Sequence, residues 1–319
     1  AIAAGNTVVA KPSEITPYTA YLLSKICDDI NFPTGVINII HGYGATAGEA
    51  IVEKADIISF TGGTETGKII ASKAAKNFKK YSLELGGKNP TLVFGDCDFD
   101  LAVNTAVKSA FLNQGQICLC GSRIFVEKTI YDDFLSAFLE KTEQLVVGDP
   151  KNKKSNLGSI VSEEHLNKII LKIDQAKKEG GKILTGGKRV FLNDDLKNGY
   201  YLSPTIITQT KNTDKINQEE VFGPVATIMP FKNEKEAIKL CNNTKYGLSA
   251  SVFTNNVSRS HRVASKIDAG VVWINTWLLR DLRIPFGGMK QSGFGREGGY
   301  YSLDFFTETK NICVKIEKD

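Results

Sequence analysis

The sequence lacks several features that would assign it to a class at once. It has no run of about eighteen apolar residues, the length that a membrane-spanning helix needs. Its six cysteines have no disulfide-framework spacing, and no C-x-x-C pair occurs. The three histidines are isolated from one another and from the cysteines. We therefore expect no membrane partner, no structural zinc or other metal site, and a reducing, cytoplasmic compartment.

An excess of charge of one sign is missing as well. The 319 residues carry a formal net charge of +5, and the lysines are scattered among carboxylates. Such a distribution is typical of solvated surfaces, so nucleic acid is not an expected partner. The chain is longer than one compact core usually requires, and more than one domain is expected.

The first part of the chain alternates short apolar strands with helices. Strands are predicted over Thr7 to Ala10, Val36 to Ile40, Ile57 to Thr61 and Tyr81 to Leu85. Helices are predicted after Thr16-Pro17 to about Cys27, over Ala45 to Lys54 and over Thr64 to Lys76. Buried strands that alternate with helices indicate right-handed β-α-β units and a parallel sheet. We interpret residues 1–86 as the C-terminal part of a Rossmann-like, dinucleotide-binding domain.

A second α/β segment follows Gly86-Gly87, and we assign residues 87–286 to a catalytic domain. Residues 287–319 differ from the preceding segments in composition. Six glycines lie between Phe286 and Gly299, which predicts a loop that turns repeatedly. Phe305 to Ile316 is predicted to be a terminal strand with an exposed edge, and this strand would join subunits of a homodimer or homotetramer.

Only the later strands of a nucleotide-binding fold are recognisable. A complete fold of this type has earlier β-α-β units, so we expect the chain to be an N-terminally truncated fragment that lacks on the order of a hundred residues.

Glycines follow one predicted strand directly. Gly62 to Lys68 fits the phosphate loop G-x-x-x-x-G-K, but Ile69 stands where that motif needs Ser or Thr for magnesium. Gly62 and Gly63 are therefore either a turn that lets backbone N–H groups approach a diphosphate or an ordinary tight strand-helix turn. These two interpretations are about equally supported.

Lys11, Ser13 and Glu14 follow another predicted strand. At the carboxyl end of a parallel strand, a cation and a carboxylate are well placed for a nucleotide. A glutamate there can accept hydrogen bonds from ribose hydroxyls and would repel a 2′-phosphate, which favours NAD. By itself, the segment is better explained as an ordinary polar loop.

Glu84 and Cys118 are the candidate catalytic pair. Glu84 ends a strand among apolar neighbours, where a carboxylate is partly desolvated and its pKa rises. Cys118 follows a helix end that a glycine opens and amide side chains surround. A free cysteine is usually a small buried hydrophobe, and we expect that role for most of the others.

Five segments together resemble the aldehyde dehydrogenase superfamily. They are FTGGTETG, LELGGKNP, NQGQICLCGSR, EEVFGPV and PFGGMKQSGFGRE, in that order. The resemblance implies that Cys118 attacks an aldehyde to give a thiohemiacetal, and that hydride transfer to NAD then leaves a thioester. It also implies that Glu84 activates water to hydrolyse this thioester.

The resemblance assigns cofactor residues too. Lys11 and Glu14 match the positions that hold the adenosine ribose, and Gly62 and Gly63 match the turn under the diphosphate. Glu220 and Phe222 match the pair that positions the nicotinamide end. The family's oxyanion-binding asparagine lies upstream of these segments, so we expect the chain alone to fold and turn over poorly.

The substrate is suggested by the segment from Trp277 to Arg283, which lies where the family has its substrate-pocket loop. With ICLCGSRIFV, this segment resembles the 2-aminomuconate and 2-hydroxymuconate semialdehyde dehydrogenases. Arg280 could clamp a distal carboxylate, and Trp277 is a second candidate substrate contact. The alternative is that Arg280 and Arg283 both pair with Asp281 or with a neighbouring subunit.

Two other functions stay open. The chain could be an aldehyde dehydrogenase of different or broad specificity, for retinal or betaine aldehyde. It could also be a non-catalytic structural relative, although the presence of both Cys118 and Glu84 speaks against this.

Overall fold

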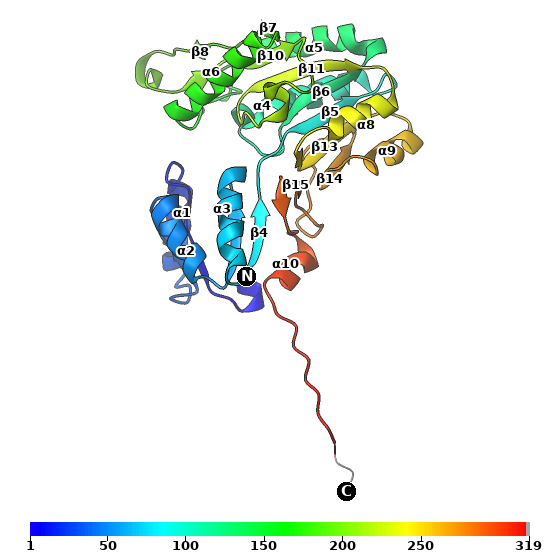
Figure 1. Ribbon diagram of the computed structural model, residues 1–319. Helices are drawn as coiled ribbons and strands as arrows, with labels where there is room; N and C mark the ends of the chain where they lie inside the picture. The colour runs from blue at the N-terminus through cyan, green and yellow to red at the C-terminus, as the bar shows by residue number, and fades with distance from the viewer. Residues whose placement is uncertain (317–319) are drawn as a thin grey trace.

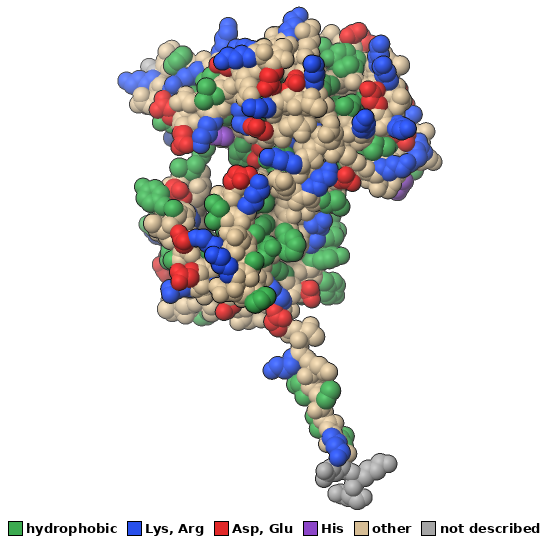
Figure 2. Space-filling model, in the orientation of Figure 1, with side chains coloured by type: hydrophobic (Ala, Val, Ile, Leu, Met, Phe, Trp, Pro, Cys, Tyr) green, Lys and Arg blue, Asp and Glu red, His purple; other side chains and the backbone are tan. Residues whose placement is uncertain are grey.

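A computed structural model describes residues 1–316 as two α/β bodies and an extended tail (Figure 1). The first body contains both the start of the chain and the return segment that leads to α10 (Gly299–Phe305). Lys, Arg, Asp and Glu side chains are interspersed over the visible face, and a hollow separates part of the first body from the second (Figure 2). No helix in the described part is both long and apolar enough to cross a membrane.

The first body is built from four parallel strands and their connecting helices. Its elements are β1 (Val8–Ala10), α1 (Tyr18–Asp29), β2 (Ile37–Ile39), η2 (Gly44–Gly48), α2 (Glu49–Lys54), β3 (Ile57–Thr61), α3 (Thr64–Ala75) and β4 (Lys80–Glu84). β1 pairs with β2 and β3 pairs with β4, all in parallel. The predicted strands are present, and a small core of aliphatic side chains from α2, α3, β3 and β4 lies beneath them.

The single parallel sheet predicted for this body is divided in two. β1 and β2 form one sheet, whereas β3 and β4 belong to another that β16 (Gly293–Phe294) completes in antiparallel orientation. The prediction missed this because apolar periodicity identifies strands and does not specify which edges meet.

The second body has a seven-stranded sheet with a helical layer on each face. Its order is β14-β13-β5-β6-β11-β10-β7, parallel except for β7 against β10. The strands are β5 (Asn89–Val93), β6 (Gly121–Glu127), β7 (Lys182–Thr185), β10 (Thr205–Thr208), β11 (Val225–Phe231), β13 (Ser249–Phe253) and β14 (Val271–Ile274). The helices are α4 (Phe99–Phe111), α5 (Tyr131–Glu143), α6 (Glu163–Lys178), α7 (Lys215–Gln218), α8 (Glu234–Asn242) and α9 (Val257–Ala264). The remaining strands β8 (Arg189–Val190), β9 (Tyr201–Leu202), β12 (Tyr246–Gly247) and β15 (Met289–Lys290) form two short pairs.

Local capping explains where several of these helices begin. The side chains of Asp98, Ser162, Asn233 and Asn256 each accept a hydrogen bond from a backbone N–H in the first turn of α4, α6, α8 and α9. Such caps satisfy one of the donors that a helix leaves free at its start.

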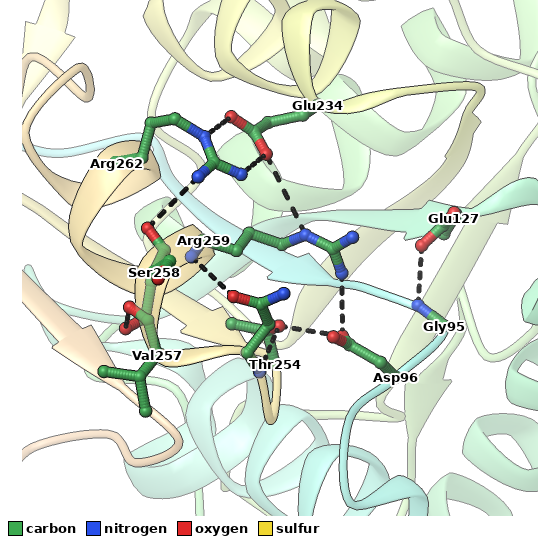
Figure 3. A network of polar contacts seen from close by, with 11 residues as sticks. Gly95, Asp96, Glu127, Glu234, Thr254, Val257, Ser258, Arg259 and Arg262 are labelled. Atoms are coloured by element: carbon green, nitrogen blue, oxygen red, sulfur yellow. Dashed lines mark hydrogen bonds and ion pairs between the residues drawn. The ribbon is translucent and has the colours of Figure 1, made fainter.

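An ionic network fastens α8 and α9 to the end of β5 (Figure 3). Arg262 makes two bonds of 2.7 Å to Glu234, and Arg259 lies 2.9 Å from Asp96. The Arg259 guanidinium also covers the Phe94 ring at 4.7 Å. This network lies beyond the carboxyl end of β5, whereas Glu84 and Cys118 lie near its amino end at Asn89, so the network serves stability.

The predicted terminal strand over Phe305 to Ile316 is wrong for the chain by itself. Phe305 ends α10, and residues 307–316 extend away from both bodies without a strand partner in the described chain. A strand needs backbone hydrogen bonds from a neighbouring strand, but β4 reaches this segment only through the Lys80 side chain, which contacts Thr307 and Glu308. Residues 317–319, which end the segment assigned to oligomerisation, lie outside the described residues.

Candidate active site

Glu84 sits at the carboxyl end of β4, held between two strands. It lies opposite Thr61 of β3 and Gly293 of β16, and its side chain is buried. Its Oε1 atom has no hydrogen-bond partner among the described residues. Burial raises the pKa of Glu84 to about 7, and the charge of Glu297 adds to the rise while Arg296 and Arg280 oppose it. A carboxyl with this pKa can take up and release a proton near neutral pH.

The backbone before Cys118 makes a rare left-handed turn. Asn113, Gln114 and Gly115 have φ values of 50°, 56° and 68° after the end of α4. A Cβ on Gly115 would lie 2.1 Å from the carbonyl oxygen of Gly223, so only glycine fits there. The turn that precedes Cys118 therefore packs tightly against the loop that carries Glu220 and Phe222.

Asn89, the first residue of β5, joins the Cys118 loop to β13. Its amide nitrogen donates to the carbonyl oxygens of Cys118 at 2.7 Å and Cys120 at 3.0 Å, and its amide oxygen accepts from the backbone N–H of Ser249 at 3.0 Å. A Cβ on Gly87 would lie 2.8 Å from the Cys118 carbonyl oxygen. Sequence reasoning missed Asn89 as a positioning residue, although it lies within LELGGKNP.

The Cys118 thiol shares its surroundings with two carboxylates. Burial raises the pKa of Cys118 most, and the charges of Glu220 and Glu84 raise it further. The backbone N–H of Cys118 and the charge of Arg280 act in the opposite direction. The thiol is only partly buried, and a nearby base that accepts its proton would generate the reactive thiolate.

Glu220 and Phe222 meet this site from the loop before β11. A Glu220 carboxylate oxygen accepts the backbone N–H of Gly87 at 2.9 Å. Phe222 has a left-handed backbone, and its ring is about 37% exposed. Glu220 therefore lies beside the segment that joins Glu84 to the second body, and Phe222 follows it in the same loop.

The predicted adenosine and diphosphate residues lie at the carboxyl ends of β1 and β3. The Lys11 ammonium pairs with Glu14 at 3.3 Å and donates to the Gly42 carbonyl oxygen at 3.2 Å. Hydrogen bonds from the backbone and from Lys11 lower the pKa of Glu14, so this carboxyl is ionised at neutral pH. Ser13 is exposed in the same turn.

Gly62 and Gly63 form the turn between β3 and α3. A Cβ on Gly62 would lie 2.5 Å from the Phe60 ring. Gly63 is the N-cap of α3, and no side chain caps that end. The first N–H groups of α3 are thus free of side-chain caps, as an anion-binding helix terminus requires.

The three predicted substrate-loop residues have different roles in the structure. Trp277 is buried and donates its ring N–H to the Leu119 carbonyl oxygen at 2.9 Å. This bond fixes the residue that directly follows Cys118. Arg283 pairs with Asp281. Arg280 instead lies over the Phe286 ring at 4.1 Å and makes no ion pair within 4 Å among the described residues. Of the alternative that both arginines pair with Asp281 or with a neighbouring subunit, the pairing with Asp281 is seen for Arg283 and not for Arg280.

Arg280 also lines a cavity of about 290 Å³. Arg296, Glu297 and Ser82 contribute to its wall, and the hydroxyl of Ser82 is buried without a hydrogen-bond partner among the described residues. Asp281 and Glu297 line the same cavity, but neither lies within 4 Å of the Arg280 guanidinium, whose charge acts on both Glu84 and Cys118.

Comparison with known proteins decides the family. The sequence profile of the aldehyde dehydrogenase family matches residues 1–312. The chain belongs to the aldehyde dehydrogenase family. The resemblance inferred from the five motifs, and the mixed α/β fold with parallel sheets, are thereby confirmed.

Several curated relatives of this aldehyde dehydrogenase chain act on muconic semialdehydes, as their names state. It is 48% identical to 2-aminomuconic semialdehyde dehydrogenase of Danio rerio and 46% identical to 2-hydroxymuconic semialdehyde dehydrogenase of Pseudomonas sp. (strain CF600). Each alignment covers 99% of this chain and 66% of the relative. The chain thus spans just under two thirds of the length of these relatives.

Solved structures of the family superpose closely. Betaine aldehyde dehydrogenase from Staphylococcus aureus, solved in complex with NAD+, matches with a TM-score of 0.90 at 43% identity, over 93% of this chain and 59% of that chain. The HpcC protein from Thermus thermophilus matches with a TM-score of 0.93 at 41% identity, over 98% of this chain and 63% of that chain.

Proposed function

We propose that the protein oxidises an aldehyde to a carboxylic acid with NAD, with Cys118 as nucleophile and Glu84 as base. The observation that carries this proposal is the pair itself: a partly buried thiol shares its electrostatic environment with a buried carboxyl whose pKa is about 7. A thiol and a base with a pKa near neutrality are what a covalent acyl-transfer mechanism requires.

The residues of the first body fit NAD. The uncapped start of α3 and the Gly62 turn, where a Cβ would meet Phe60, suit a diphosphate. Ionised Glu14 suits a ribose with two free hydroxyls and disfavours a 2′-phosphate. Lys11 holds Glu14 in place, Ser13 lies beside them, and Glu220 with Phe222 would meet the nicotinamide end.

The chain's own residues carry the covalent steps. Glu84 takes the proton of the Cys118 thiol, and the sulfur adds to the aldehyde carbon to give the thiohemiacetal in its alkoxide form. Glu84 then releases this proton to solvent and is again a base. Bound NAD would supply the hydride acceptor for this adduct, and Cys118 would then carry the acyl group as a thioester. Glu84 then takes a proton from water, the hydroxide attacks the thioester carbonyl, and the C–S bond breaks. The acid departs, and Glu84 returns its proton to the Cys118 thiolate, which restores the thiol and the base.

Replacing Cys118 with alanine should abolish aldehyde-dependent NADH formation, because no other thiol can form the adduct. The matched control is Cys120→Ala, since Cys120 is buried and its pKa is raised to about 12. The control should retain most of the activity. Equal loss in both variants, or retained activity without Cys118, would contradict the proposal.

We also propose that the aldehyde carries a distal carboxylate, as a muconic-type semialdehyde does. Arg280 supports this, because its guanidinium is free of acidic partners within 4 Å among the described residues and can bind a carboxylate with two hydrogen bonds. Trp277 would contribute by supporting the Cys118 turn. The broad-specificity alternative would leave Arg280 a structural role only.

Replacing Arg280 with methionine should remove the preference for the charged substrate. We expect the ratio of kcat/KM for a muconic-type semialdehyde over an uncharged aldehyde of similar length to fall roughly ten- to hundredfold. Arg283→Met is the control, because Arg283 is mostly exposed and already paired with Asp281. A ratio near one in the unmodified protein would favour broad specificity.

The remaining proposals concern organisation and partners. We propose residues 1–86 as part of the cofactor domain, 87–286 as the catalytic domain and 287–319 as the return and oligomerisation segment. A homodimer or homotetramer is supported by the extended tail, in which Ile312, Val314 and Ile316 alternate and are each at least 76% exposed. Six free cysteines support a reducing, cytoplasmic compartment.

A further inference from the structure

Phe222 is held in a conformation that it would not adopt without support. Its φ of 56° lies in the left-handed region, which is rare for a bulky side chain and typically costs about 1–3 kcal/mol. The residue is about 37% exposed, so its side chain is not locked in place by full burial. Neighbouring groups that contact the backbone at this position help to fix it.

Two contacts hold the backbone at Phe222 and Gly223. The Nε2 atom of His165 lies 2.7 Å from the Phe222 carbonyl oxygen, and the two rings meet edge to face with centroids 6.1 Å apart. One residue further on, the Gly223 carbonyl packs against Gly115, where a Cβ would lie only 2.1 Å from the carbonyl oxygen. Since a carbonyl oxygen only accepts, His165 must carry its hydrogen on Nε2.

His165 itself is fixed by the start of α6. Its backbone N–H donates to the hydroxyl of Ser162, the N-cap residue, at 3.2 Å. The imidazole therefore projects from the first turn of a sixteen-residue helix that the second body anchors through the buried side chains of Leu166 and Ile169. Helix α6 therefore holds the Nε2–H donor of His165 in a fixed position beside the Phe222 carbonyl oxygen.

We propose that His165 is a positioning residue for the nicotinamide half of the cofactor, acting through the Phe222 backbone. The inference rests on the proposed NAD-dependent function. Glu220 lies two residues before Phe222 and accepts the Gly87 N–H, so rotation of the Phe222 peptide would displace both side chains of this loop. Without the imidazole donor, the left-handed backbone relaxes and the nicotinamide subsite loses its shape, while the adenosine subsite at Lys11, Glu14 and Gly62 is untouched.

The test compares two ligands by titration calorimetry on the full-length protein: NAD, and ADP, which lacks the nicotinamide ribose and ring. His165→Phe keeps an aromatic edge against Phe222 and removes the donor. We expect its Kd for NAD to rise about tenfold, while its Kd for ADP stays within about twofold of the unmodified protein. His165→Gln, which retains an N–H donor, should recover most of the NAD affinity.

Equal weakening of both ligands, or no change for either, would overturn the inference and leave His165 a structural residue. If the unmodified protein bound neither ligand, the proposed cofactor function itself would fail, and this outcome is distinct. Should His165→Phe not fold, His165→Asn makes the same comparison, because its shorter side chain cannot span the distance to the carbonyl oxygen.

Discussion

Replacing Glu84 with glutamine should stop the reaction after one turnover. Without a base to activate water, thioester hydrolysis should slow roughly a hundredfold to ten-thousandfold, while Cys118 can still form the adduct, more slowly, with solvent as proton acceptor. Stopped-flow absorbance should then record at most one NADH per active site, followed by a nearly flat phase. Continued turnover at the unmodified rate would assign the base to another group.

The pH dependence of the same step follows from the environment of Glu84. Because burial raises its pKa from the ordinary 4.5 to about 7, the basic form is lost as the pH falls below 7, and hydrolysis should slow in that range. The same pKa shift has the opposite effect on the stability of the fold, which it favours at acid pH. The folded state binds the proton more tightly than the unfolded state, so this contribution to stability is full below pH 4.5 and is lost as the pH rises to about 7. Glu84→Gln should therefore raise the melting temperature at pH 8.

Replacing Gly115 with alanine should damage both the fold and the site. The new Cβ would lie 2.1 Å from the Gly223 carbonyl oxygen, and alanine is strained at a φ of 68°. We expect the free energy of unfolding to fall by roughly 2–4 kcal/mol, measured by urea denaturation. NAD affinity should fall as well, because the displaced Gly223 belongs to the loop of Glu220 and Phe222.

Gly158→Ala is the matched control for this substitution. A Cβ there would meet only the Gln114 and Pro150 side chains, at 3.4 Å and beyond, so the change should be tolerated. If Gly115→Ala were equally harmless, the two loops would not be locked together as described.

The sequence predicted those parts of the structure that depend on local pattern. The strand over Ile57 to Thr61 has the predicted bounds, and α3 ends one residue before the prediction. Alternation of apolar residues and glycine turns sets these elements over short distances. The motifs likewise indicated Glu84 and Cys118, which the fold brings into one electrostatic environment.

The contacts that the sequence did not reveal join distant segments. Asn89 bonds to Ser249 across 160 positions, and His165 bonds to Phe222 across 57. An isolated histidine carries no periodic or spacing signal, so nothing in the sequence pointed to His165. The prediction of a terminal strand was wrong for a related reason. The alternating Ile312, Val314 and Ile316 fit a strand, but a strand forms only where a partner strand is present.

The most direct test of the central claim is to locate the covalent intermediate. Glu84→Gln protein would be mixed with aldehyde and NAD, quenched in acid, digested and analysed by mass spectrometry. The proposed mechanism predicts an acyl group on the peptide that contains Cys118, and only when NAD is present. NADH formation with no acylated cysteine, or with the acyl group on a different cysteine, would contradict it.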